Sequence, residues 1–202
     1  MISAIVLAAG EARRMGQTKQ LIELRGKPLL QHVLDSLLAS QVAEVILVLG
    51  HDADKILKTI CTGEIKIVIN PAFREGMSTS IRQGLLALAP NTRGFFICLG
   101  DQPGIGKDVV NCLIGEFERH FPEKSIIVPA YRGSRGHPVL FSAKYRQEAS
   151  ELRGDIGCRP LLVNHPEDLL TVEVDTEAVL ADIDTPEDLV QSGRAKPLEE
   201  PK

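Results

Sequence analysis

The sequence has no surplus of positive charge and no long apolar run. The 202-residue chain carries 23 basic and 27 acidic residues, a net charge of −4, and so offers no general basic surface for nucleic acid. Its apolar runs have the length of strands, far short of a membrane span. The first residues also lack the basic segment of a signal peptide. We therefore expect neither a nucleic-acid partner nor a membrane partner.

Closely spaced cysteines are also missing. The four cysteines, at positions 61, 98, 112 and 158, form no short-spaced pair, which excludes zinc-ribbon and thioredoxin-like motifs. Cys98 and Cys112 lie within apolar patterns, and we expect both to be reduced core residues. The expected compartment is the cytoplasm.

Two common phosphate-binding glycine motifs are absent. Five residues separate Gly10 from Gly16 and Gln17 follows, whereas the Walker loop has four residues between its glycines and then a lysine. Glu11 and Ala12 after Gly10 exclude the dinucleotide fingerprint G-x-G-x-x-G. The sequence also shows no recognisable Ser/His/Asp catalytic arrangement. ATPase, NAD-dependent and serine-hydrolase activities thus lose their main support.

Residues 5–19, IVLAAGEARRMGQTK, join an apolar run to a small-residue loop rich in positive charge. Small residues let backbone N–H groups approach an anion closely. Arg13, Arg14 and Lys19 add fixed positive charge nearby. The segment favours a polyphosphate site at the end of a strand, with a plain glycine-rich turn as the alternative.

Apolar, β-rich runs alternate with helical periodicity along the chain. Helices are expected over 29–38, 78–89 (with Ser78 or Thr79 as its cap), 109–117 and from 185 onward. Strands are expected at 2–7, 45–49, 65–69, 95–99, 126–129, 139–141 and 170–174. This alternation predicts an α/β fold with a mostly parallel sheet, helices on both faces and an antiparallel extension from about residue 125.

Acidic residues follow two of the predicted strands. Asp101 comes directly after the strand at 95–99, where ligands collect in parallel sheets, and its carboxylate suits a divalent cation such as Mg²⁺. Alternatively, it only caps the turn that follows. Asp182, Asp184 and Asp188 form a second acidic group. We expect Asp184 to face the same cation, Asp182 to be the lesser ligand and Asp188 to begin a helix.

Three further loops combine glycine with polar side chains. The segments 132–138 and 152–160 each bracket charged residues with glycine, and they either grip an anionic second substrate or form solvated surface turns. Residues 76–80 either present a helix N-terminus and hydroxyls to a nucleotide or form an ordinary cap. His137 has an ordinary pKa near neutrality, although a histidine before a proline is more often structural.

Taken together, residues 5 to about 190 resemble the nucleotidyltransferases that activate metabolites with a nucleoside triphosphate. The resemblance lies in LAAG at 7–10 with RMG at 14–16 and Lys19, GKPLL at 26–30, GDQP at 100–103 and IDTPEDL at 183–189. Within that group, RGHPV at 135–139 and GDIG at 154–157 are similar to segments of the molybdenum cofactor cytidylyltransferases. The resemblance implies a three-layer Rossmann-like nucleotide-diphospho-sugar transferase fold. Because the sequence shows no internal repeat and no linker, we expect a single domain over 1–190, followed by a polar tail at 191–202 that contains two prolines.

The resemblance also implies roles for individual residues. Arg14, Lys19 and Asp101 would be catalytic, with Mg²⁺ held by Asp101 and Asp184. The nucleotide would contact Leu7, Ala8, Ala9, Gly10, Arg14, Gly16, Lys19, Ser78, Ser80 and Gly100. The acceptor would contact Gln102, Arg135, Gly136, His137, Pro138, Gly154, Asp155 and Gly157.

The implied reaction joins CTP to the terminal phosphate of molybdopterin and releases pyrophosphate. Ala9 favours CTP, because the related guanylyltransferases tend to carry glycine there. Glu11 and Ala12 depart from the family, which usually has a serine near the start of this loop. The alternatives are GTP, another acceptor such as a sugar phosphate or an isoprenoid precursor, a non-catalytic molybdopterin-binding chaperone, and a subunit that docks on a molybdoenzyme.

Overall fold

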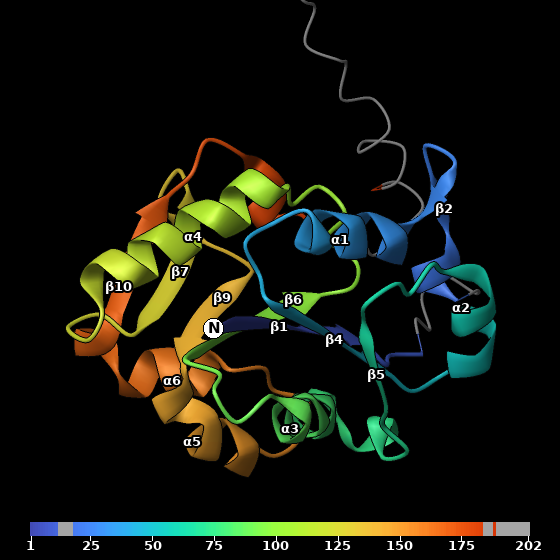
Figure 1. The fold of residues 1–202 in the computed structure, drawn as a ribbon, viewed down its shortest axis with the longest axis horizontal. Helices are drawn as coiled ribbons and strands as arrows, with labels where there is room; N and C mark the ends of the chain where they lie inside the picture. The colour runs from blue at the N-terminus through green and yellow to red at the C-terminus, as the bar shows by residue number, and fades with distance from the viewer. Residues whose placement is uncertain (12–17, 184–187, 189–202) are drawn as a thin grey trace, which may run out of the picture.

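One large sheet organises the molecule. The computed structural model describes residues 1–11, 18–183 and 188. Within them, the sheet has the strand order β10-β7-β9-β6-β1-β4-β5, and β8 pairs with β7 (Figure 1). The strands are β1 (Ile2–Ala8), β4 (Glu44–Leu49), β5 (Lys66–Ile69), β6 (Gly94–Leu99), β7 (Ile126–Tyr131), β8 (Ser134–Arg135), β9 (Val139–Ser142) and β10 (Leu169–Glu173). A separate hairpin joins β2 (Glu23–Leu24) to β3 (Lys27–Pro28).

Four of the seven strand pairs in the described part of the large sheet are parallel, in agreement with the mostly parallel sheet that the sequence predicts. β1 runs parallel to β4 and β6, β4 to β5, and β7 to β10. The long antiparallel strand, β9, lies between β6 and β7, so it sits inside the sheet and not at its edge. Because β9 is antiparallel to both β6 and β7, these two strands run in the same direction, and so does β10, which is parallel to β7. The carboxyl ends of six strands therefore meet at one edge, which we call the carboxyl edge.

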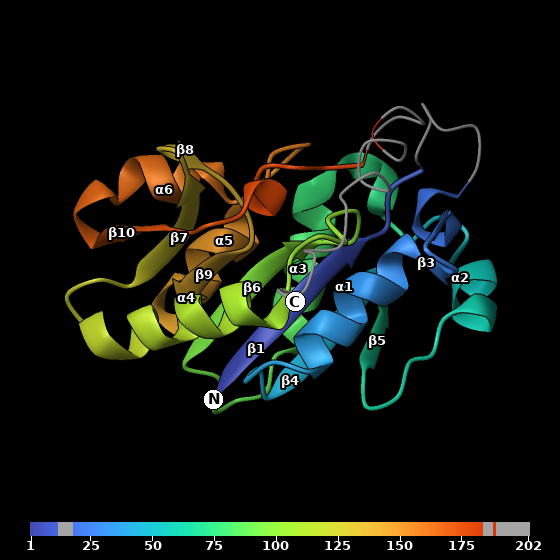
Figure 2. The same cartoon turned by 90° about the horizontal axis from the view of Figure 1, so that it is seen from above.

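Helices cover both faces of the sheet, which gives three layers (Figure 1, Figure 2). One face carries α1 (Leu29–Leu38), α2 (Ala53–Thr59) and α4 (Lys107–His120), and the other carries α3 (Met77–Ala87), α5 (Arg146–Glu151) and α6 (Arg159–Asn164). Alternate residues of β1 serve the two cores: Ala4 and Val6 pack towards the first face, and Ile5 towards the second. Short 3₁₀ turns complete the chain: η1 (Lys19–Leu21), η2 (Phe73–Glu75), η3 (Ala143–Tyr145), η4 (Pro166–Asp168) and η5 (Glu177–Val179).

The predicted long elements are confirmed, with ends shifted by at most three residues, and the short ones were missed. Strands β2, β3 and β8 have two residues each, and helices α2, α5 and α6 have six or seven, too few for a periodic pattern. The predicted helix start at 185 and the tail at 191–202 lie outside the described residues. No described helix is long and apolar enough to cross a membrane.

Two local predictions are wrong. Cys112 is exposed, because it lies on the outer face of α4, whereas Cys98 is buried; all four cysteines are free thiols. Helix α3 has Gly76 as its N-cap and no side-chain cap from Ser78 or Thr79. Its first N–H groups bond instead to residues far along the chain, which no local pattern reveals.

Helix α3 approaches β1 at Gly84, and this contact makes a test of the packing. A Cβ at Gly84 would lie 2.3 Å from Cγ2 of the fully buried Ile5. We expect Gly84→Ala to cost about 1–3 kcal/mol of unfolding free energy through overpacking. In α4, a Cβ at Gly115 would meet nothing within 4 Å, so Gly115→Ala should stabilise by about 0.5–1 kcal/mol. Urea unfolding measures both, and equal effects would contradict the close approach.

Candidate active site

A partly buried ion pair lies at the carboxyl edge of the sheet. Lys19 Nζ donates to Asp101 Oδ2 at 2.6 Å, although the two residues are 82 positions apart. The Lys19 side chain is 9% exposed and that of Asp101 is 29% exposed. A cation and a carboxylate are thus held together where a ligand would enter. Two of the three residues predicted to be catalytic therefore meet; the third, Arg14, lies outside the described residues.

Strand pairing explains why these distant residues meet. β1 and β6 are parallel neighbours with Leu7 opposite Leu99, so the segments that follow both strands start at the same edge. The Gly100 N–H donates to the Leu7 carbonyl at 3.0 Å. A Cβ at Gly100 would lie 3.0 Å from Ala8 Cβ and 3.1 Å from Leu7 O. Glycine therefore lets the turn before Asp101 approach the end of β1.

The chain on both sides of the segment 12–17 is anchored by side chains. Gln20 Nε2 donates to the Ala8 carbonyl at 3.2 Å and to the Gly10 carbonyl at 3.4 Å. Arg74 Nε donates to Glu11 Oε1 at 2.7 Å. Arg13, Arg14 and Gly16 themselves lie outside the described residues.

The Thr18 hydroxyl donates to the Asp52 carboxylate, and the backbone of Asp52 is left-handed, with a φ of 53°. Lys55 Nζ in turn donates to Thr18 Oγ1 at 3.4 Å. Sequence analysis missed Gln20, Thr18 and Asp52, because single polar residues after a loop carry no motif. These contacts fix Thr18, and so the chain that leads into Lys19.

The second Asp101 oxygen fits a cation. Asp101 Oδ1 is buried and has no hydrogen-bond partner among the described residues. An orphaned buried carboxylate oxygen is costly unless an ion or water satisfies it, and carboxylate oxygens are ligands that hard divalent cations prefer. The chemistry of Asp101 therefore fits a divalent cation on one oxygen with Lys19 on the other.

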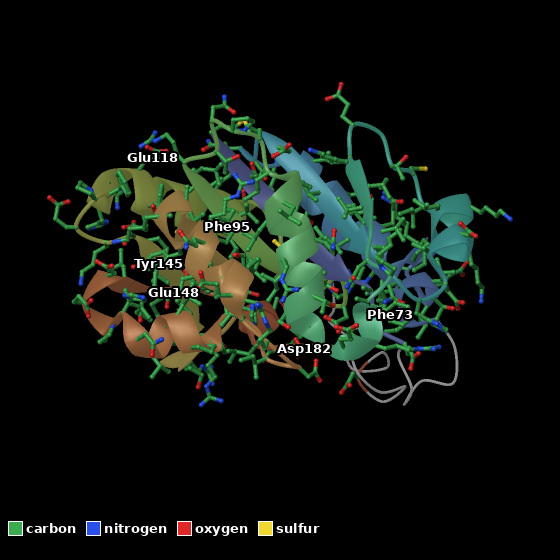
Figure 3. The ribbon with its side chains drawn as sticks, turned by 90° about the horizontal axis from the view of Figure 1, so that it is seen from below. Phe73, Phe95, Glu118, Tyr145, Glu148 and Asp182 are labelled. Carbon is green, nitrogen blue, oxygen red and sulfur yellow. The ribbon has the colours of Figure 1, made fainter. Side chains whose placement is uncertain are left out.

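The segment before Asp184 is bonded to the turn that carries Asp101. The Ile183 N–H donates to the Asp101 carbonyl at 3.1 Å. Gln102 Nε2 donates to Asp182 Oδ1 at 2.6 Å, and Gln102 is only 1% exposed. Figure 3 shows Asp182 and Phe73 at the same end of the molecule. Asp184 itself lies outside the described residues, one residue beyond this contact.

Residues 136–138 bind the same C-terminal segment from the other side. The His137 N–H donates to the Val179 carbonyl at 2.9 Å. A Cβ at Gly136 would lie 2.1 Å from that carbonyl oxygen, so only glycine fits. Arg135 is exposed in β8. We call residues 177–183, which these contacts and the Asp101 turn hold, the C-terminal strap.

Burial lowers the pKa of His137 below its ordinary value, and the negative charges of Asp182 and Asp101 only partly oppose this shift. A backbone hydrogen bond with Ile97 also opposes it. His137 is therefore neutral at neutral pH, and its place beside the strap supports the structural alternative for this residue.

The predicted nucleotide loop at 76–80 lies against the predicted acceptor loop at 154–157. The Ser78 N–H donates to the Gly154 carbonyl, and the Met77 N–H donates to Asp155 Oδ1, both at 3.2 Å. Ser80 Oγ accepts from Asn70 Nδ2 at 2.9 Å and is buried. Ser78 Oγ is also buried, with no partner in the part of the chain that the structure describes. The two loops form one unit.

A second group of potential metal ligands lies away from this site. Ligand atoms of His165, Glu167 and Asp168 lie within 4.8 Å of one another. Asp168 Oδ2 already accepts from Lys144 Nζ at 2.7 Å and from the Tyr145 hydroxyl. These two hydrogen bonds lower the pKa of Asp168. Both Asp168 and Asp101 are paired with a lysine, but of the two only Asp101 has a buried oxygen without a partner among the described residues, so it fits a cation better.

With this geometry in place, comparison with known proteins identifies the family. The MobA-like NTP transferase domain matches residues 4–169. The chain belongs to this family. Membership supports nucleotidyl transfer from a nucleoside triphosphate to a phosphate-bearing acceptor as the class of reaction, and the mixed α/β fold agrees with it.

The relatives carry more than one activity. A nicotine blue oxidoreductase from Paenarthrobacter nicotinovorans is 29% identical over 93% of this chain and 94% of its own length. The molybdenum cofactor cytidylyltransferase of Escherichia coli K12 is 27% identical over 94% of each chain. A crystal structure of Rv0371c from Mycobacterium tuberculosis, complexed with manganese, is 27% identical with a TM-score of 0.80, covering 94% of this chain and 96% of that one. Similarity to these proteins alone does not fix the substrate of this MobA-like chain.

The contact between Gly136 and Val179 tests how the strap is held. Because the obstacle is a backbone carbonyl, Gly136→Ala must displace the strap, and we expect a loss of about 1–3 kcal/mol of unfolding free energy. Gly115→Ala, where a Cβ would meet nothing within 4 Å inside a helix, should not lower the stability. Thermal and urea unfolding check the pair, and a neutral Gly136→Ala would contradict the contact.

Proposed function

We propose that the chain is a cytidylyltransferase that joins CTP to the terminal phosphate of a molybdopterin-type acceptor and releases pyrophosphate. The observation that carries the proposal is the partly buried Lys19–Asp101 pair, in which the second Asp101 oxygen has no partner among the described residues. A protein that only carried a cofactor would not need a lysine and an orphaned carboxylate oxygen together at the carboxyl edge. The E. coli relative named for this reaction supports the choice of substrates.

In the proposed reaction, an oxygen of the acceptor phosphate attacks the α-phosphorus of CTP in line. The bond from that phosphorus to the bridging oxygen breaks, and pyrophosphate leaves with the electron pair. A phosphomonoester has a second pKa of about 6, so the attacking phosphate is ionised near neutral pH and needs no general base. A neutral, partly buried His137 is consistent with this.

Charge neutralisation and positioning carry the catalysis. Lys19, with Arg14, stabilises the triphosphate and the charge that develops on pyrophosphate. In this proposal the phosphates lie against Leu7, Ala8, Ala9, Gly10, Gly16 and Gly100, with Ser78 and Ser80 near the nucleoside. Asp101 and Asp184 would hold Mg²⁺, which when bound offsets the repulsion between the two phosphate groups.

The acceptor is proposed to lie against Arg135, Gly136, Pro138, Gln102, Gly154 and Gly157. Arg135 is the exposed cation of this set and suits a phosphate. Gln102 and Gly136 contact the C-terminal strap, so they would shape the acceptor side of the site by positioning the strap. The four free thiols are consistent with work in the cytoplasm.

A triphosphate survey tests the proposal. The purified chain is incubated with Mg²⁺, a molybdopterin source and CTP, GTP, ATP or UTP, and products and pyrophosphate are measured by mass spectrometry and a coupled assay. The cytidylyl product is expected. A guanylyl product, or transfer to a sugar phosphate or an isoprenoid precursor phosphate, would reassign the substrates. Binding without pyrophosphate release would favour a carrier, and redox turnover would favour the activity named for the oxidoreductase relative. Co-purification tests docking on a molybdoenzyme.

Replacing the lysine tests the catalytic pair. Lys19→Ala removes a preorganised cation, and we expect turnover to fall by about a hundredfold or more. Lys27→Ala serves as the matched control, because Lys27 is an exposed lysine paired with Asp35, and it should keep activity within about twofold. Steady-state pyrophosphate release measures both variants. Full activity in purified Lys19→Ala would refute the role.

Replacing the aspartate tests the cation site without turnover. Asp101→Asn should weaken Mn²⁺ binding by at least about tenfold, since losing even a residue that orients a ligand has that effect. Asp108→Asn changes an exposed acid in the first turn of α4 and should leave affinity unchanged. Titration calorimetry with Mn²⁺ in place of Mg²⁺ gives the dissociation constants. Equal affinities for wild type and Asp101→Asn would remove Asp101 as a ligand.

A further inference from the structure

The first turn of α3 is capped by a loop nearly eighty residues further along the chain. Asp155 Oδ1 accepts from the Met77 N–H and the Gly154 carbonyl accepts from the Ser78 N–H, both at 3.2 Å. The first N–H groups of a helix have no partner within it, and no side chain of α3 or its N-cap residue supplies one. These two hydrogen bonds therefore cap the N-terminus of α3 in place of a local side chain.

The backbones at this contact are in close approach. Gly76 has a φ of 111°, and a Cβ there would lie 2.4 Å from the Gly154 carbonyl carbon. Only glycine allows the chain before α3 to lie this close to the loop. The loop is therefore fitted to the start of α3 and does not merely pass near it.

A second attachment lies further along α3. Arg82 Nε donates to the Ser150 carbonyl at 3.1 Å, and Arg82 Nη2 donates to the Leu152 carbonyl at 3.3 Å. Residues 150–155 are thus bonded to α3 at two levels, about one turn apart. These hydrogen bonds hold the loop in a fixed position relative to the first turn of α3.

One polar group at this turn is left without a partner. Ser78 is 1% exposed, and its Oγ has no hydrogen-bond partner among the described residues. A buried hydroxyl without a partner is costly unless a ligand or water satisfies it. Its backbone N–H, in contrast, is fixed by Gly154. The loop sets the position of the residue whose hydroxyl is free to meet a ligand.

We propose that Asp155 is a positioning residue of the nucleotide site, acting through the first turn of α3 and not as a contact of the acceptor. The inference rests on the proposed function, and it replaces the acceptor contact that the resemblance implies for Asp155. By accepting the Met77 N–H, the carboxylate holds the turn in which Ser78 meets the nucleotide. The segment 154–157, which the resemblance assigns to the acceptor, thereby sets the affinity for the nucleotide.

Two substitutions separate this role from a direct one. Asp155→Ala removes the acceptor for the Met77 N–H, whereas Asp155→Asn keeps an oxygen that accepts it and removes only the charge. Glu151→Ala, an exposed acid on α5 bonded to Gln147, is the charge-matched control. Nucleotide affinity is measured by titration of CTP with Mg²⁺ in the absence of acceptor, and amide hydrogen exchange follows residues 77–81 in the free protein.

We expect Asp155→Ala to weaken CTP binding about threefold to tenfold, the size of a lost helix cap, and to speed exchange at residues 77–81. Asp155→Asn and Glu151→Ala should match wild type within about twofold on both measures. In turnover, Asp155→Ala should raise the KM for the nucleotide and leave the KM for the acceptor unchanged.

Several results would overturn the inference. A raised acceptor KM with unchanged CTP affinity would make Asp155 an acceptor contact, and equal losses in Asp155→Asn and Asp155→Ala would show that its charge matters. Faster exchange without weaker CTP binding would reduce the loop to a purely structural cap. If the wild-type protein binds no nucleoside triphosphate, both the proposed function and this inference fail. If the wild type binds CTP and Asp155→Ala binds it equally well, only the inference fails.

Discussion

Everything in the candidate site depends on the parallel pairing of β1 with β6. That pairing places the chain after Ala8 beside the turn after Leu99 and lets Lys19 reach Asp101. Two opposite charges at low exposure are stable only when each has the other or hydrogen bonds nearby. The sheet therefore creates the geometry, and the ion pair in turn fixes the two segments. A catalytic arrangement for phosphate chemistry needs this kind of preorganised charge.

Close backbone approaches complete the assembly. Gly100 fits against the end of β1, Gly136 fits under the Val179 carbonyl, and Gly76 lies on Gly154. At each position a side chain would displace backbone or a packed neighbour, so these glycines serve contact and not flexibility. Together these three contacts join six separate segments of the chain in pairs. Nucleotidyl transfer, which must bring two anions together, needs such convergence.

Much of the fold could be predicted, because long elements leave periodic patterns. The strand at 2–7 and the helix at 29–38 appear in the structure as Ile2–Ala8 and Leu29–Leu38. Elements of two to seven residues give no period, and Cys112 was misplaced because an apolar neighbourhood does not tell which helix face a residue takes. Within the site, Lys19 and Asp101 stood out from the sequence by their loops, whereas Gln20 and Thr18 did not.

The sequence by itself determined the alternation of strands and helices, the basic loop after β1 and the acid after β6, because each is written in consecutive residues. Only the tertiary structure decided that Asp155 accepts from Met77 and that Gln102 donates to Asp182. These partners lie about eighty residues apart, and their meeting depends on where an antiparallel strand enters the sheet and how α3 packs on it. Hydrogen bonds across such distances follow from packing, which no local pattern encodes.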